Sequence, residues 1–136
     1  MYLLGMATWN DVSRLARALP ETVESTDTNG LKWEVRSKHF AYERPLRKRD
    51  LEALVDSVPS GEILGVRVSD LDDKRGLIGS NPDVFFTIPH FASYEAVLIV
   101  LDHIDLDQLD EVLIEAWLAR APKRLVASYL DAPRLK

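Results

Sequence analysis

Basic residues are concentrated in one short run of the sequence, ERPLRKRD. Arginine and lysine at this density can neutralise several phosphates of a nucleic-acid backbone, so the run is a candidate binding site. Glu43 and Asp50 flank it and would neutralise part of its charge, so a solvated charged loop is the alternative. The candidate nucleic-acid-binding residues are the cations of the run and two that precede it: Arg36, Lys38, Arg44, Arg47, Lys48 and Arg49.

A second cationic pair, Lys123 and Arg124, follows Pro122 at the start of the last predicted helix. The free N–H groups of a helix N-terminus attract anions, so these two cations form a possible anion site. The alternative is that they pair with acids on the preceding helix, such as Glu111 and Glu115. Surface pairs of that kind contribute little energy.

Histidine can supply metal ligands or a general base, and the chain has three: His39, His90 and His103. They show no His-x-x-His or His-Glu-x-x-His spacing, so a metal site would need side chains that converge from distant segments. The sequence has no cysteine, which excludes disulfides, thiolate nucleophiles and zinc sites built on sulfur. We therefore predict no metal site and no cofactor.

His90 lies between Pro89 and Phe91, just before the most apolar run of the chain. Ser93 is close to it, but the Gly-x-Ser-x-Gly pattern of a nucleophile elbow is absent, as is a Gly-rich phosphate loop. An enzyme would require a concave pocket that holds His90 beside a titratable partner. We predict instead a protein without catalytic activity, in which His90 stabilises the turn by hydrogen bonding or packs on Tyr94.

Composition limits the classes of function. The chain has 136 residues, a net charge of −5 and a pI of 5.2. An acidic total argues against binding nucleic acid through the overall field, so a DNA contact would depend on a local basic patch. No apolar run approaches the roughly 20 residues of a membrane span, and the start lacks the features of a signal peptide. Together with the absence of cysteine, this predicts a cytoplasmic protein that has no membrane contact.

The elements that position these residues begin with a helix. Thr8 is a suitable cap, an acid three residues later completes a capping box, and apolar residues at helical spacing predict a helix over 8–19. Residues 20–30 are rich in turn formers and end at Asn29-Gly30, a strong signal for chain reversal. We expect this segment to be a turn.

Alternation between apolar and polar residues predicts strands in the middle of the chain. LKWEVR and KHFAYER form a hairpin around Ser37, and GEILGVRVSD gives a third strand. Asp70 then caps a short helix over 71–79. DVFFTI is a fourth strand. AVLIVL, at 96–101, is apolar at every position, so we expect both of its faces to be covered.

Two more helices complete the chain, the longest capped by Asp105 and the last beginning at Pro122. KRDLEALVDS has helical spacing and predicts a short insertion helix. The order α-β-β-β-α-β-β-α plus a C-terminal helix predicts a two-layer α+β fold, with an antiparallel sheet and helices on one face. We expect one domain over 6–131, a loose extension at 1–5 and a tail at 132–136.

Four segments resemble the MmcQ/YjbR family: MATWNDVSRLARALPETVEST, WEVRSKHFAYERPLRKRDLEAL, DVFFTIPHFASYEAVLIVLD and EAWLARAPKRLVASYL. They occur in the family's order and cover residues 6–131, and their most specific parts are 86–91 and 121–124. One departure is Ser37, where many members place glycine in the turn between strands. The resemblance implies a two-layer α+β fold similar to secretion chaperones and frataxin-like proteins, which agrees with the order above.

The resemblance also implies a function. The family is commonly described as DNA-binding, from a double-wing arrangement inferred from structure, and no catalytic activity, cofactor or site residue comes with it. We therefore expect a DNA-binding protein, a monomer or weak dimer, that contacts phosphates through the candidate cations. The alternative, which the net charge of −5 favours, is a module that binds another protein and not nucleic acid.

Overall fold

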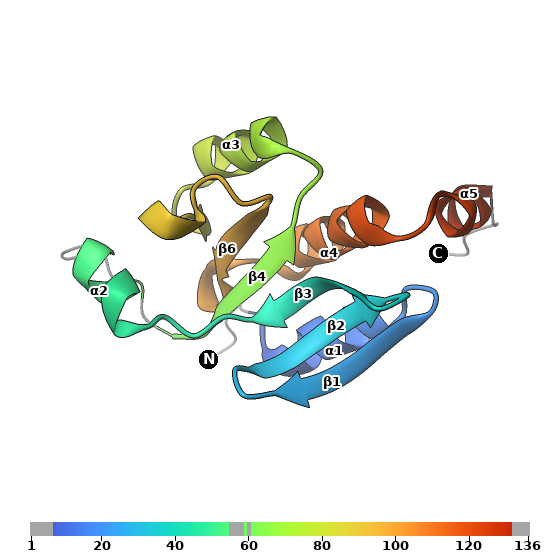
Figure 1. Ribbon diagram of the computed structural model, residues 1–136, viewed down its shortest axis with the longest axis horizontal. Coiled ribbons are helices and arrows are strands. Elements are labelled where there is room, and N and C mark those ends of the chain that lie inside the picture. The colour runs from blue at the N-terminus through green and yellow to red at the C-terminus, as the bar shows by residue number, and fades with distance from the viewer. Residues whose placement is uncertain (1–6, 55–58, 60, 132–136) are drawn as a thin grey trace.

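A computed structural model of the chain describes residues 7–54, 59 and 61–131, which fold around a six-stranded sheet (Figure 1). Neighbouring strands are antiparallel, in the order β1-β2-β3-β4-β6-β5. The strands are β1 (Thr22–Asp27), β2 (Gly30–Val35), β3 (Lys38–Glu43), β4 (Ile63–Arg67), β5 (Phe85–Phe86) and β6 (Ala96–Val100). The helices are α1 (Trp9–Arg17), α2 (Lys48–Leu54), α3 (Leu71–Ser80), α4 (Leu106–Arg120) and α5 (Lys123–Asp131), with 3-10 turns at Pro89–Phe91 and Leu101–His103.

One face of the sheet carries the main hydrophobic core. Helices α1 and α4 contact each other on this face (Figure 1), where Val12 and Leu113 pack with Trp33 and Val66 of the strands. Successive side chains of a strand point to opposite faces, so alternate strand residues supply this core. The two-layer α+β fold with an antiparallel sheet is confirmed.

The opposite face of the sheet has a smaller hydrophobic cluster of its own. Leu98 and Val100 of β6 pack there with Ile88, and Leu54 of the predicted insertion helix, α2, closes over them. All five residues of β6 are buried. The prediction that both faces of AVLIVL are covered is therefore confirmed.

Strand β1 corrects the prediction of a turn over 20–30. Thr22–Asp27 pair with β2 along their whole length. As the edge strand, β1 has no continuous apolar side: Val23 is 58% exposed, and Glu24 accepts a hydrogen bond from the Nε1–H of Trp33 at 2.7 Å. Threonine and valine favour strands, but a polar edge strand lacks the alternation that periodicity detects.

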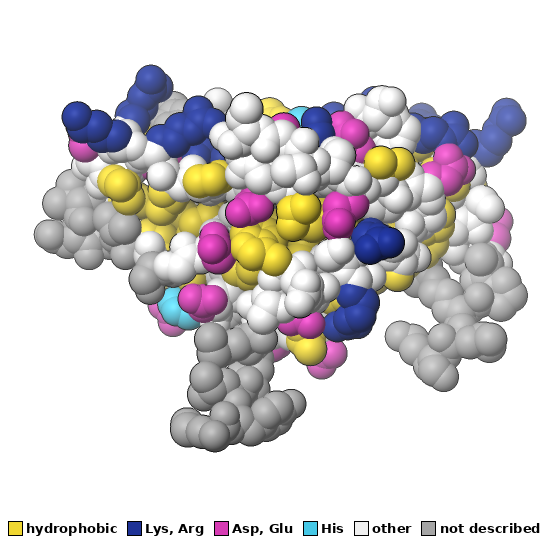
Figure 2. Space-filling view, turned by 90° about the horizontal axis from the view of Figure 1, so that it is seen from below, with side chains coloured by type: hydrophobic (Ala, Val, Ile, Leu, Met, Phe, Trp, Pro, Cys, Tyr) yellow, Lys and Arg dark blue, Asp and Glu magenta, His cyan; other side chains and the backbone are white. Residues whose placement is uncertain are grey.

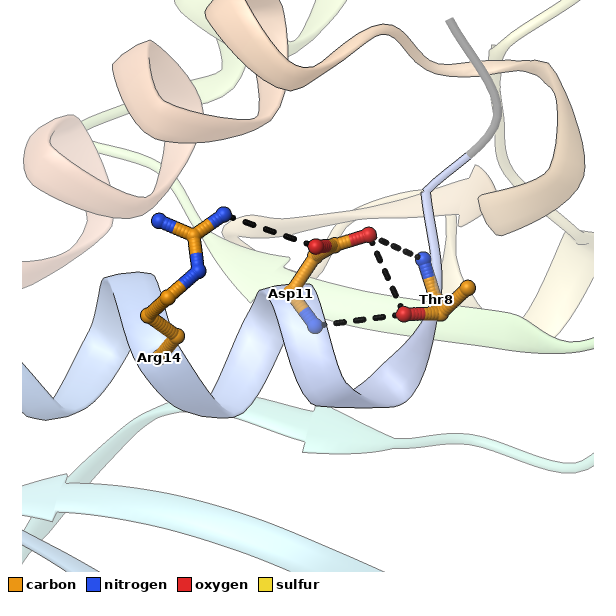
Figure 3. Close-up of polar contacts among 3 residues, drawn as sticks. All are labelled: Thr8, Asp11 and Arg14. Carbon is orange, nitrogen blue, oxygen red and sulfur yellow. Dashed lines mark hydrogen bonds and ion pairs between the residues drawn. The ribbon is translucent and has the colours of Figure 1, made fainter. Parts of the chain in front are cut away.

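The N-terminus of α1 has the predicted capping box (Figure 3). The Thr8 hydroxyl accepts a hydrogen bond from the N–H of Asp11 at 3.3 Å, and the Asp11 carboxylate accepts one from the Thr8 N–H at 2.9 Å. Burial alone would raise the pKa of Asp11, but the hydrogen bonds from Thr8 and the charge of Arg14 lower it. Because the pKa is lowered by folding, this stabilisation is lost as the pH falls through the folded-state value. Asp70 and Asp105 cap α3 and α4 as predicted.

Several boundaries differ from the prediction. Helix α1 ends at Arg17 and not at residue 19, and β5 contains only two residues of DVFFTI. Arg36 and Ser37 form the turn between β2 and β3 with φ values of 49° and 68°. Two positive φ values are typical of a type I′ hairpin, so Ser37 adopts the conformation that glycine would take with less strain.

The remaining predictions on the chain's organisation concern its ends and membranes. The expected extension at 1–5 and tail at 132–136 lie outside the described residues. In the part of the chain that is described, no helix is long and apolar enough to cross a membrane.

Candidate functional site

Arg44, a member of the candidate nucleic-acid-binding set, points into the protein. Its guanidinium lies 3.1 Å from the Asp50 carboxylate, and the side chains of the pair are 11% and 0% exposed. The guanidinium also lies over the ring of Phe91, 5.9 Å from its centroid. Asp50 accepts a second hydrogen bond, from the N–H of Arg47 at 2.9 Å, so the carboxylate ties the first turn of α2 to the strand end. This arrangement gives Arg44 a structural role.

The other members of the set lie in two groups at opposite ends of β3. Arg47, Lys48 and Arg49 are exposed at the start of α2, whereas Arg36 lies in the β2–β3 turn and Lys38 follows it. A six-residue strand separates the groups by about 17 Å. Arg47 donates a hydrogen bond to the Asn29 side chain at 3.0 Å, and Arg36 is ion-paired with Glu21. Figure 2 shows Lys and Arg side chains in separate groups, with acidic and apolar side chains between them.

Lys123 and Arg124 are exposed on the first turn of α5. None of the ion pairs found within the described residues joins them to Glu111 or Glu115. The possible anion site at this position stays a prediction.

His39 and His103 have different partners. His39 packs edge-on against Tyr42, with ring centroids 5.1 Å apart, and burial together with the nearby positive charge of Arg67 lowers its pKa. The ring of His103 forms a hydrogen bond with the carbonyl of Asp83 at 2.8 Å. The side chain of His90 is not among those that the structure describes, so its structural role stays a prediction. Within the described ranges, no group of three or more His, Asp and Glu side chains is arranged to hold a metal ion.

A groove with a volume of about 360 Å³ lies between α3 and α4. Its floor is apolar and consists of Val66, Val68, Leu77 and Val112. Its rim is acidic: α3 contributes Asp72 and Asp73, and α4 contributes Glu111 and Glu115. We call this feature the α3–α4 groove. The remaining lining residues are Arg67, Ser69 and Gly76.

Gly76 is one of the residues that line the α3–α4 groove. It lies inside α3, and a Cβ atom built on it would meet nothing within 4 Å. Packing therefore does not require glycine at this position. Glycine inside a helix costs about 0.5–1 kcal/mol relative to alanine. A larger side chain here would occupy part of the open space along the groove.

Lys74 holds α3 in position from the side of the helix away from the groove. Its side chain is 2% exposed, and the ammonium donates hydrogen bonds to the carbonyls of Phe91, Ala92 and Tyr94 at 2.7, 3.3 and 2.8 Å. Burial lowers the pKa of this amine. The contacts connect α3 to the loop before β6, so one wall of the groove is fixed by a buried polar anchor.

The comparisons with known proteins identify the family. A family model described as YjbR matches residues 17–119. The chain belongs to the YjbR family. This YjbR protein is 49% identical over 128 residues to the uncharacterized protein Rv2570 of Mycobacterium tuberculosis, an alignment that covers 92% of this chain and 97% of that protein. The uncharacterized protein Mb2600 of Mycobacterium bovis has the same identity and coverage. No solved structure matches the chain.

The YjbR match includes every residue that lines the α3–α4 groove, whereas Lys123 and Arg124 lie beyond it. Sequence reasoning missed the groove because its acids have ordinary local explanations. Asp72 and Asp73 favour the dipole at the start of α3, and acids on α4 are expected on a solvated face. The available signal was Glu111 and Glu115, which are four residues apart and thus share one face of a helix.

Proposed function

We propose that this YjbR protein is a non-enzymatic protein-interaction module that takes a segment of a partner protein into the α3–α4 groove. The observation that supports this is the groove itself, which combines apolar lining residues with open space at Gly76 on a helix that Lys74 anchors. Apolar side chains of a partner that pack into the groove against Leu77 would be removed from water, which is the main favourable term in protein association.

The lining of the groove favours binding over catalysis. It contains the hydroxyl of Ser69 but no histidine that could activate it, and its acids are spread along a rim. Nucleophilic catalysis needs a nucleophile and a base within hydrogen-bonding distance of each other. The groove provides shape and charge for a ligand without that pair.

Filling the groove should weaken peptide binding. A Gly76→Phe variant places a ring in the open space above the floor, so affinity for amphipathic helical peptides should fall by at least about tenfold, a loss of about 1.4 kcal/mol. Gly79→Phe is the matched control, because Gly79 is also in α3 with nothing near its Cβ position but does not line the groove. Fluorescence anisotropy with labelled peptides of about 16 residues measures both variants. Equal binding by the two variants would refute the proposal.

DNA binding is the second candidate, and one observation favours it. Lys48 and Arg49 are exposed at the start of α2 and belong to none of the ion pairs found within the described residues. They could therefore contact phosphates without first breaking a salt bridge. This agrees with the common description of the family as DNA-binding.

The test of DNA binding is its salt dependence. Anisotropy of a labelled duplex should show an affinity that falls as salt rises, and a Lys48→Gln/Arg49→Gln variant should reduce the slope of log K against log salt by about two. Arg14→Gln/Arg17→Gln on α1 removes the same charge elsewhere on the surface and should leave the slope unchanged. No binding at low salt, or an equal effect of both variants, would exclude this candidate.

A further inference from the structure

We propose that the segment bound in the α3–α4 groove is a basic amphipathic helix. It would set lysine or arginine side chains against the acidic rim and its apolar face against the floor. This inference rests on the proposed protein-interaction function and specifies the partner's chemistry.

The charge of the groove selects a basic partner. Four carboxylates line it, against one guanidinium, that of Arg67. Arg67 is already engaged: it donates hydrogen bonds to the Tyr94 hydroxyl and the Glu95 carbonyl, both at 2.9 Å, and lies 4.6 Å from the centroid of the Tyr94 ring. These partners are neutral and Arg67 keeps its charge, but the four carboxylates outnumber it, so the groove is negative overall. Like charges brought together at an interface are costly, so an acidic segment is excluded and a basic one is favoured.

The positions of the acids match a helical partner. Asp73 is exposed on α3, and Asp72 is exposed there beside Arg75, its ion-pair partner. On α4, Glu111 and Glu115 are exposed and lie about 6 Å apart along the helix axis, because each residue adds about 1.5 Å. Cations four residues apart on a docked helix have the same spacing and would meet both glutamates.

The sheet topology argues against an extended partner. Strand β4, whose end forms part of the floor, lies inside the sheet between β3 and β6. An added peptide strand needs a free edge for its backbone hydrogen bonds, and β4 has none. Helix α3 lines the groove through Asp72, Asp73, Gly76 and Leu77, so one wall of the groove is helical. A helix satisfies its own backbone and can bind through side chains alone.

The experiment compares three labelled helical peptides of about 16 residues that share one leucine face and carry Lys, Gln or Glu on the polar face. The Lys peptide should bind at least about tenfold more tightly than the Gln peptide, and the Glu peptide should bind most weakly. The advantage of the Lys peptide should shrink between about 50 and 500 mM salt. The advantage of the Lys peptide should also shrink in a Glu111→Gln/Glu115→Gln variant of the protein. The control variant, Glu52→Gln/Asp107→Asn, removes exposed acids outside the groove and should preserve this advantage.

The outcomes separate the two proposals. Equal binding of the Lys and Gln peptides, each lost in Gly76→Phe, would overturn the basic partner while supporting a protein-binding groove. Binding of the Lys peptide that survives Gly76→Phe would show attraction to the acidic surface in general and overturn both. Absence of binding by all three peptides would also overturn both. Sedimentation of the protein alone completes the test, because self-association that Gly76→Phe abolishes would assign the groove to a second copy of this chain and overturn the basic partner.

Discussion

Replacing Trp117 with alanine should lower the free energy of unfolding by about 3–5 kcal/mol. The indole is completely buried on α4, and its Nε1–H donates a hydrogen bond to the carbonyl of Pro20 at 3.0 Å. It also packs against Tyr129 of α5, with ring centroids 5.0 Å apart. The substitution therefore leaves a cavity, removes the donor from a part-buried carbonyl and deprives α5 of an aromatic contact.

Urea unfolding of purified variants measures this effect, and hydrogen exchange in 123–131 reports whether α5 loosens. Trp117→Phe is the control because it keeps a ring against Tyr129 while losing the hydrogen bond and part of the buried volume, so it should cost less, about 1–3 kcal/mol. A loss below about 1 kcal/mol for Trp117→Ala would contradict a close-packed indole at this position.

Replacing Asp50 with alanine should destabilise the protein by about 3–5 kcal/mol, because it leaves the guanidinium of Arg44 buried without its carboxylate. The same change removes the acceptor for the N–H of Arg47 at the start of α2. If α2 detaches while the sheet stays folded, the measured loss equals the free energy that holds α2 in place. Hydrogen exchange across 48–54 distinguishes detachment from global unfolding.

Two controls accompany the Asp50 variant. Arg44→Met combined with Asp50→Leu removes both charges together, so it should recover the part of the loss that comes from the unpaired guanidinium, but not the part that comes from the lost Arg47 hydrogen bond. Glu52→Ala changes an exposed acid on the same helix and should stay within about 0.5 kcal/mol of the natural protein. If Asp50→Ala were as mild as Glu52→Ala, the ion pair with Arg44 would not be a structural anchor.

Sequence reasoning predicted the elements whose signals are local. The caps at Thr8, Asp70 and Asp105 involve residues three positions apart, and the burial of 96–101 follows from a continuous apolar run. The polar edge strand β1 was missed because its pairing partner, and not its own pattern, makes it a strand.

The candidate sites were harder to predict, because they depend on which side chains turn inward. Arg44 lies in the same basic run as Arg49, yet only Arg44 is buried against a carboxylate. The α3–α4 groove needs α3 and α4 to lie next to each other, and no local spacing reports that proximity. The place of Gly76 in the groove likewise cannot be predicted until the position of α4, which forms the other wall, is known.

The division of the core between the two ends of the chain affects the protein during its synthesis. Strands β1, β2 and β3 are consecutive in sequence and pair with one another, and α1, made before them, stacks Trp9 on Trp33. The rest of their inner face, including Phe40 and Ala41, belongs to the core that α4 completes only from residue 106 onward. On the ribosome, this apolar surface is exposed until most of the chain has emerged, and that interval is when a chaperone would protect the nascent protein from aggregation.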